Sequence, residues 1–522
     1  MKDTLFQRLL KYFNIDEETY LELNKQVTID NFCAGHSFKD LDKAVDIVKA
    51  AIKNKDKIFI YGDYDADGIM STSIVTKALL KLGVIPSFYI PNRYNDGYGL
   101  TLKKAQEVVE KGFKLVITVD NGVSAFEPIA YLKEHDVTVL VLDHHTIQET
   151  VPNADVIIHP SYSEFGEVAT SAGFVSFMFS WTLLGYFDKY LSTLAAISVI
   201  TDMMPLKEYN RHFLRLVFAS YKRGEFLNID LLKGDSDFDE NGIGMRIGPK
   251  INALGRLLED ESINYIVNYF VTEDPQKINR LYGWIDRINE ERKIISRSAE
   301  ESLADFVSDK PAIVIHKDVK EGLIGILANH LCSREHKPAI VFTEEKDADV
   351  LKGSCRAPEG FNVVDAFNYC GDLVITSGGH ALAGGCSIYK KDLEEFERRF
   401  IEFTEKTPLK EEVVEDVVEI GLTEINRENF DMIESFAPFG EGWRAPLFVI
   451  KRIKRETLTF SKTGEHLLSY VGAAIRITGF GISKAQLADY SFVDLFGRMR
   501  LSSYRGVISI EFLVKKAEKS SK

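Results

Sequence analysis

The sequence predicts an α/β fold class in which two α/β domains are joined by a long helix and followed by a C-terminal β-barrel. Three observations support this prediction. Short apolar runs alternate with helical segments from Lys57 to Pro160, a charged stretch with few helix breakers covers residues 273–306, and strand-like alternation begins near residue 447. Short β-branched strands separated by helices are typical of a parallel, doubly wound sheet.

The expected elements follow one another along the chain. Residues 1–55 have a helical pattern, because apolar positions recur three and four residues apart. The next strands are expected at "IFIYG", "PSFYI", "LVITVD", "TVLVLD" and "VIIHP". The second α/β domain contains the runs "PAIVIH", "PAIVFT" and "LVITSGG", and the tail contains "FVDLFGRMRLSS" and "VISIEFLVKK". An all-β tail of this size suggests a barrel of the OB type, a fold that often binds single strands.

These patterns divide the chain into five expected segments. They are an N-terminal helical segment (1–55), a first α/β domain (56–270), a linker helix (271–308), a second α/β domain (309–408) and an OB-fold domain (409–522). Three aromatic residues of the tail could stack on bases or fill the barrel, and the sequence does not separate these roles: Phe492, Phe496 and Tyr504.

The composition is that of a soluble globular protein, with 45% hydrophobic and 27% charged residues among 522. The five cysteines form no CxxC pair, which argues against a disulfide framework or a structural zinc site and suits a reducing cytoplasm. The longest uncharged stretch, residues 169–187, is interrupted by Ser, Thr and Gly. We therefore expect a buried helix there, and no membrane association.

The charge is distributed unevenly. Residues 451–522 contain 14 Lys and Arg against 6 Asp and Glu, a net charge of +8, whereas the whole chain carries −14. The rest of the chain therefore carries −22. An acidic body with a basic tail domain indicates that any contact with a nucleic-acid backbone involves the tail.

Acidic residues follow several of the predicted strands. Asp63, Asp65 and Asp67 alternate in "GDYDADG", and further acidic or imidazole side chains occur in "TVDNG" (Asp120), "VLDHH" (Asp143, His144, His145) and "ITDMMP" (Asp202). Because the carboxyl ends of parallel strands meet at one edge of a sheet, these side chains are expected to converge. For "GDYDADG" alone, ordinary turn chemistry is the competing interpretation.

Carboxylates with imidazole suit Mn²⁺, with Mg²⁺ as the alternative, better than thiophilic metals. Close carboxylates cannot all ionise cheaply without a compensating cation. The number of candidate ligands exceeds the needs of one ion, so we expect two divalent cations that share a bridging carboxylate.

Several motifs of the chain resemble those of a known protein family. The motifs "DYDADG", "VDNG", "DHH" and "SVITDMMPL" resemble the four ordered motifs of the DHH phosphoesterase superfamily. Six further segments resemble the RecJ-like exonucleases within it: "PNRYNDGYGL", "IGPKINALGRL", "EGLIGILANHL", "KGSCRAPEGFNVVDAF", "SGGHALAGG" and "APFGEGWRAPLF". The likeness runs from about residue 20 to the end, and one departure is Gly442-Trp443-Arg444, where the family has Gly-Asn-Pro.

The resemblance implies roles for the matching positions. The implied metal ligands are Asp63, Asp65, Asp67, Asp120 (bridging), His144 and Asp202. The implied catalytic set is Asp65, Asp67, Asp120, His144 and His145, with His145 contacting phosphate or orienting a ligand and Asp143 supporting the histidines. The implied substrate-binding residues are Arg93, Tyr98, Asn252, Arg256, Ser354, Arg356 and His380.

The resemblance also implies an activity: metal-dependent 5′→3′ hydrolysis of single-stranded DNA to 5′-mononucleotides by in-line attack of water, in DNA repair and recombination. The implied partner is single-stranded DNA, with a single-strand-binding protein or a helicase as candidate protein partners and a monomeric chain. Two alternatives are weighed: an oligonucleotide (nanoRNase or 3′-phosphoadenosine-phosphate) phosphoesterase of the same superfamily, and a non-catalytic replication or repair scaffold. An assay that compares cleavage of a long single strand with cleavage of a dinucleotide distinguishes the exonuclease from the first alternative. The presence of every expected metal ligand argues against the second.

Overall fold

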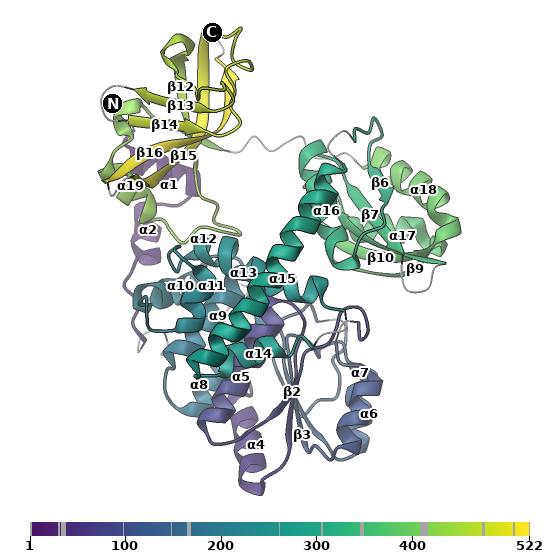
Figure 1. Ribbon diagram of the computed structural model, residues 1–522. Helices are drawn as coiled ribbons and strands as arrows, with labels where there is room; N and C mark the ends of the chain where they lie inside the picture. The colour runs from purple at the N-terminus through teal and green to yellow at the C-terminus, as the bar shows by residue number, and fades with distance from the viewer. Residues whose placement is uncertain are drawn as a thin grey trace. The chain divides into compact units, whose positions relative to one another are not determined.

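The computed structural model describes residues 3–29, 32, 38–97, 99–147, 149–163, 169–259, 262–303, 306–344, 349–379, 381–407, 416–471, 475–504 and 507–520 (Figure 1). The chain forms two compact units. One combines 1–35, 203–219 and 414–522, and the other combines 36–202 with 220–413. The unit of residues 36–202 and 220–413 contains two α/β domains.

The first α/β domain is built on a fully parallel sheet with the strand order β2-β1-β3-β4-β5. Its strands are β1 (Ile58–Tyr61), β2 (Ser87–Tyr89), β3 (Leu115–Val119), β4 (Thr138–Leu142) and β5 (Val156–Ile158). From β1 the chain moves to β2 on one side and then to β3 on the other. The strand order therefore reverses between β1 and β3, which is where ligands bind in open α/β sheets.

Helices cover both faces of this sheet. Up to the linker they are α4 (Leu41–Asn54), α5 (Ala66–Lys81), α6 (Leu102–Glu110), α7 (Phe126–Glu134), α8 (Ala172–Leu184), α9 (Lys189–Thr201), α11 (Leu227–Lys233), α12 (Glu240–Gly242), the π-helical turn η2 (Ile243–Ile247), α13 (Gly248–Leu257) and α14 (Tyr265–Val271). Helices α6 and α7 pack on one face, and α5 and α8 pack on the other. Helix α8 is almost completely buried, which confirms the buried helix expected there. Within the described residues, no helix has both the length and the apolar character needed to cross a bilayer.

The long helix α15 (Pro275–Glu301) confirms the predicted linker helix and leads into the second α/β domain. That domain has a mixed sheet of order β6-β7-β8-β10-β9, in which only β6 and β7 are parallel. Its elements are β6 (Ile313–His316), α16 (Glu321–Glu335), β7 (Ala339–Glu344), β8 (Val350–Arg356), α17 (Val363–Cys370), β9 (Val374–Gly379), β10 (Ala383–Tyr389) and α18 (Leu393–Lys406).

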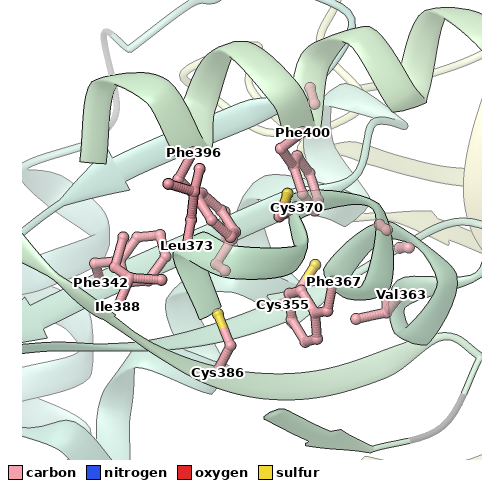
Figure 2. Packing of buried hydrophobic residues seen from close by; sticks show 14 of the residues in the cluster. Phe342, Cys355, Val363, Phe367, Cys370, Leu373, Cys386, Ile388, Phe396 and Phe400 are labelled. Carbon is pink, nitrogen blue, oxygen red and sulfur yellow. The ribbon is translucent and has the colours of Figure 1, made fainter. Parts of the chain in front are cut away.

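Three cysteines belong to the hydrophobic core of this second domain. Figure 2 shows Cys355, Cys370 and Cys386 among aromatic rings that include Phe396 and Phe400 of α18. Burial raises the pKa of the Cys370 thiol to about 12 and that of Cys355 higher still. These thiols are free and protonated, so they act as small apolar side chains rather than as nucleophiles.

The other unit contains the C-terminal barrel together with N-terminal helices. Its strand order is β11-β12-β15-β16-β14-β13. Its helices are α1 (Leu5–Phe13), α2 (Glu17–Leu23), α10 (Glu208–Ser220) and α19 (Arg427–Glu434), and its strands are β11 (Val417–Glu419), β12 (Leu447–Lys454), β13 (Leu467–Val471), β14 (Ile475–Gly479), β15 (Phe492–Tyr504) and β16 (Val507–Lys519). Helix α1 packs against β11 and α19. The barrel predicted from the tail is therefore confirmed, and it forms one unit with helices from the other end of the chain.

Arg211 and Trp443 hold this unit together. The fully buried Arg211 guanidinium donates hydrogen bonds to the carbonyl oxygens of Phe436, Ala437 and Pro438 at 2.7–3.1 Å. Trp443 stacks on Phe13 with ring centroids 4.3 Å apart, and the Arg211 guanidinium lies 5.0 Å from the Trp443 ring. The tryptophan that departs from the family pattern thus fills the space between α1 and α10.

We predict that Arg211→Met destabilises the barrel unit by about 3 kcal/mol, because three buried carbonyl groups lose a charged donor. The matched control is Arg427→Met, which removes an exposed arginine of the same unit that pairs with Asp431. Urea unfolding followed by tryptophan fluorescence measures both variants. Equal midpoints for Arg211→Met and the control would contradict this role.

Candidate metal centre and phosphate site

The loop between β1 and α5 presents three aspartates at the point where the strand order reverses. Asp65 caps α5: its Oδ1 accepts hydrogen bonds from the backbone N–H groups of Asp67 at 2.9 Å and Gly68 at 3.1 Å. A Cβ on Gly68 would lie 2.5 Å from the backbone of Asp63, so only glycine lets α5 start this close to the strand end. Asp65 thus has the turn and capping role that was the competing interpretation of this motif, and the same loop also brings the three carboxylates close together.

Asp67 is buried at the amino end of α8. Its Oδ2 accepts a hydrogen bond from Ala172 N at 2.9 Å, and its Oδ1 accepts from Gly173 N at 2.8 Å and from the Ser198 hydroxyl. Backbone N–H groups at a helix amino terminus stabilise a negative charge. The Asp67 carboxylate is thus held in place by hydrogen bonds from α8 and α9.

Asp120 and His144 bring the other strand ends to the same place. Asp120 directly follows β3 with φ of 61°, a left-handed conformation that aspartate tolerates better than most residues. His144 Nε2 lies 3.2 Å from Asp120 Oδ1, 3.5 Å from Asp67 Oδ2 and 3.5 Å from Asp202 Oδ2. One imidazole nitrogen therefore faces carboxylates from three different segments.

Three overlapping sets of side chains have ligand atoms that all lie within 4.8 Å of one another. The sets are Asp63–Asp65–Asp120, Asp67–His144–Asp202 and Asp120–His144–His145. Asp120 and His144 each belong to two of them, and of these two only Asp120 is a carboxylate. All six ligands expected from the sequence are thus brought together.

The electrostatics of these groups fit divalent cations. Burial, followed by repulsion from neighbouring carboxylates, raises the pKa of Asp63 and Asp120 well above the ordinary value and that of Asp202 to about 9. Among the described residues, Asp63 Oδ1 and Asp202 Oδ2 are buried without a hydrogen-bond donor. Burial also lowers the pKa of His144 and favours the neutral, ligating imidazole. Hard oxygen donors with one imidazole match Mn²⁺ or Mg²⁺.

Asp143 lies behind the histidines. Its Oδ1 accepts from the backbone N of His144 at 2.7 Å and lies 2.8 Å from His145 Nδ1, and its Oδ2 accepts from Val123 N. Burial raises the pKa of Asp143, but the contacts with His145, together with Val123 N and the charge of His144, outweigh it and hold this pKa at about 2. In return, Asp143 raises the pKa of His145 against the opposing effect of burial. The pair fixes the orientation of the His145 ring.

Asn252, expected to bind substrate, contacts the metal loop. Its Oδ1 accepts a hydrogen bond of 2.9 Å from Ala66 N at the start of α5. The same helix, α13, carries Arg256, whose backbone oxygen accepts from the Tyr94 hydroxyl. Asn252 therefore supports the loop that carries Asp65 and Asp67.

The predicted arginines gather beside the carboxylates. Arg93 lies over the Tyr64 ring at 4.4 Å, and Arg356 donates to Ser354 Oγ at 3.1 Å. Burial, followed by the charges of nearby arginines, lowers the pKa of Arg256 to about 10. One of those arginines, Arg292 of α15, was not expected from the sequence. The two remaining predicted residues, Tyr98 and His380, lie outside the described residues.

A signal for Arg292 exists in the sequence. Asn289, Arg292 and Ser296 are spaced three and four residues apart, which places three polar side chains on one face of a helix. Asn289 and Ser296 are only 2% and 7% exposed. Polar side chains are unusual on the packed face of an amphipathic helix, so this pattern marks the face as one with a polar role.

Comparisons with known proteins agree with this architecture. Three family models match in order: the DHH family N-terminal domain at residues 57–213, the DHHA1 domain at 308–406 and the RecJ OB domain at 418–516. The single-stranded-DNA-specific exonuclease RecJ of Bacillus subtilis is 33% identical over 77% of this chain. The chain spans about half of that relative's length, 53%.

RecJ of Haemophilus influenzae is 29% identical over 91% of this chain and 90% of its own length. The crystal structure of RecJ from Thermus thermophilus in complex with Mn²⁺ has the same fold, with a TM-score of 0.84 at 23% identity. That match covers 99% of this chain and 76% of the other. The chain therefore carries a DHH family N-terminal domain, a DHHA1 domain and a RecJ OB domain in this order, and it resembles RecJ over most of its length.

Proposed function

We propose that the protein is a metal-dependent exonuclease that hydrolyses single-stranded DNA from the 5′ end and releases 5′-mononucleotides. The observation that carries this proposal is the convergence of five aspartates and His144 at the reversal point of the parallel sheet. The names of the curated relatives, which are single-stranded-DNA-specific exonucleases, support the substrate.

We infer that two divalent cations, with Mn²⁺ preferred, are bound at this site. The residues that would hold them are Asp63, Asp65, Asp67, Asp120, His144 and Asp202, with Asp120 shared. When bound, such ions supply an activated water and stabilise the negative charge that develops on the attacking and leaving oxygens at phosphorus.

The protein's own groups position the reaction. The amide groups of α8 hold the Asp67 carboxylate in place, and Asp143 holds the His145 ring so that it can donate a proton to a phosphate oxygen. Arg93, Arg256 and Arg356 bind phosphate groups of the strand, because a guanidinium presents a planar fork of donors. A strand bound in this way would place its scissile phosphorus between the carboxylates and the arginines. This position is suited to in-line attack by water.

The barrel domain supplies a second contact with the strand. The net charge of +8 over its residues 451–522 favours the phosphate backbone independently of sequence. Tyr470 and Phe480 are 66% and 63% exposed on the barrel and are suited to stacking on bases. The aromatics chosen from the sequence are less accessible: Phe492 and Phe496 are half-buried, and the side chain of Tyr504 lies outside the described part. We expect a cytoplasmic monomer that a single-strand-binding protein or a helicase recruits.

We predict that the purified protein with Mn²⁺ digests long single-stranded DNA and releases label from the 5′ end first. The measurement uses matched 5′- and 3′-labelled strands, DNA and RNA in parallel, with Mn²⁺ or Mg²⁺. Early release of the 3′ label would contradict the polarity. Cleavage restricted to dinucleotides would favour the oligonucleotide phosphoesterase, and no cleavage under any condition would favour the scaffold.

We predict that Asp120→Asn lowers kcat at least about a hundred-fold, because a neutral amide cannot bridge two cations. Asparagine tolerates the left-handed backbone at this position, so the fold should persist. The matched control is Asp46→Asn, which changes an exposed aspartate of α4. Full activity of Asp120→Asn with Mn²⁺ would overturn the two-metal proposal.

We predict that Asp63→Asn stabilises the metal-free protein by about 1 kcal/mol or more, because it removes one of several crowded buried charges. The same substitution should reduce the increase in melting temperature that Mn²⁺ produces in the wild type. Differential scanning calorimetry with and without Mn²⁺ measures both effects, with Asp46→Asn as the control. A metal-free variant less stable than the wild type would be inconsistent with electrostatic crowding.

A further inference from the structure

Three helices of the first α/β domain, α5, α8 and α9, pack against one another next to the metal centre (Figure 1). Helix α5 carries Asp67 in its first turn, and Asp202 is the C-cap of α9. Together with His144, these two residues form one of the three sets of converging ligand atoms, here named the Asp202 set. The packing of the three helices therefore determines how two ligands of this set lie relative to each other.

Ser198 of α9 has an unusual hydrogen bond for a serine inside a helix. Its side chain is fully buried. Hydroxyl groups within helices often donate to a carbonyl oxygen one turn earlier in the same helix. Ser192 and Thr193 of α9 do so, each to the carbonyl oxygen of Lys189. Ser198 instead donates to Asp67 Oδ1 at 2.5 Å, so its hydroxyl group is directed at a candidate metal ligand.

The close approach of α8 to α9 makes this contact possible. A Cβ on Gly173 of α8 would lie 2.3 Å from Ser198 Oγ, so the helices can be this close only with glycine there. Ser198 Oγ also lies 2.5 Å from Ser171 Oγ, which accepts from the backbone N–H of Phe174. Because the Ser171 hydroxyl can donate to Ser198, the Ser198 proton is available for Asp67.

The two carboxylate oxygens of Asp67 differ in their hydrogen bonds. Oδ1 accepts from Gly173 N and from the Ser198 hydroxyl. Oδ2 accepts from Ala172 N and lies 3.5 Å from His144 Nε2. A carboxylate oxygen has two lone pairs, so these two donors saturate Oδ1. In the described part of the chain, Oδ2 therefore keeps a lone pair on the side of the Asp202 set.

We propose that Ser198 is a positioning residue for the divalent cation that the Asp202 set would hold. Its hydroxyl group occupies Asp67 Oδ1 and thereby directs Oδ2 toward that cation. This inference rests on the two-cation site of the proposed function, and it assigns Ser198 to one of the two ions. The alternative is a purely structural role, in which Ser198 only connects α9 to α8 through Ser171.

The test measures Mn²⁺ binding to the full-length protein without DNA, from the electron paramagnetic resonance signal of free Mn²⁺. For the wild type, we expect two bound ions. Ser198→Ala should weaken the binding of one ion about 10- to 100-fold, as for the loss of other groups that orient a metal ligand, and leave the other ion nearly unchanged. Ser198→Cys keeps a weak donor of similar size, so its loss of affinity should be smaller.

The matched control is Ser192→Ala, which removes an equally buried hydroxyl group of α9 that bonds to its own helix. It should bind both ions as the wild type does. Ser171→Ala removes the N-cap of α8 and the contact with Ser198, so it should lower the melting temperature of the metal-free protein. It leaves Ser198 able to donate to Asp67, and both ions should therefore bind with nearly wild-type affinity.

The outcomes separate this inference from the function on which it rests. A wild type that binds fewer than two Mn²⁺ ions contradicts the two-cation site of the proposed function. A wild type that binds two ions, with a Ser198→Ala variant that keeps both affinities or loses both equally, overturns the inference alone. If Ser171→Ala weakens Mn²⁺ binding as much as Ser198→Ala does, the connection between α8 and α9 is the cause, and the structural role is established instead.

Discussion

Repulsion between buried carboxylates is the constraint on which the rest of this structure depends. The reversal of strand order between β1 and β3 brings Asp63 and Asp120 together, and α5 and α9 add further acids. Much of the surrounding architecture reduces the cost: Asp65 caps a helix, and Asp67 sits on the amides of α8. These local hydrogen bonds leave part of the negative charge uncompensated. Divalent cations are suited to neutralise that remaining charge.

The arginines beside the carboxylates repeat this arrangement with the opposite sign. Acids crowd on one side of the site and guanidinium groups on the other, and each set offsets only part of the other's charge, because the pKa of Asp63 stays raised and that of Arg256 stays lowered. Each arrangement destabilises the ligand-free protein and strengthens binding of a ligand of opposite charge. Such preorganisation favours ligand binding but lowers the stability of the ligand-free protein. The large cores of the α/β domains offset this loss of stability.

The sequence predicted those features that follow from short-range periodicity. The strand ends could be located because β-branched runs stop at Asp63, Asp120 and Asp143, and parallel strands must place these ends on one edge. The bond from Ala66 to Asn252 and the approach of Arg292 to Arg256 could not be predicted in this way, since they depend on how helices far apart in the chain pack. Likewise, nothing in residues 1–55 indicated that α1 would pack against the barrel.

The composition of the barrel unit has a consequence for how the protein is made. Phe13, Arg211 and Trp443 come from three distant parts of the chain, yet they form one packed contact. This contact cannot form until synthesis has passed residue 443, whereas the parallel sheet is complete once residue 158 has been made. Domains generally fold as units during synthesis, and contacts between distant segments form slowly. Until then the side chains of α1 and α10 that pack on Trp443 lack this partner, and apolar surface that is exposed during folding favours aggregation.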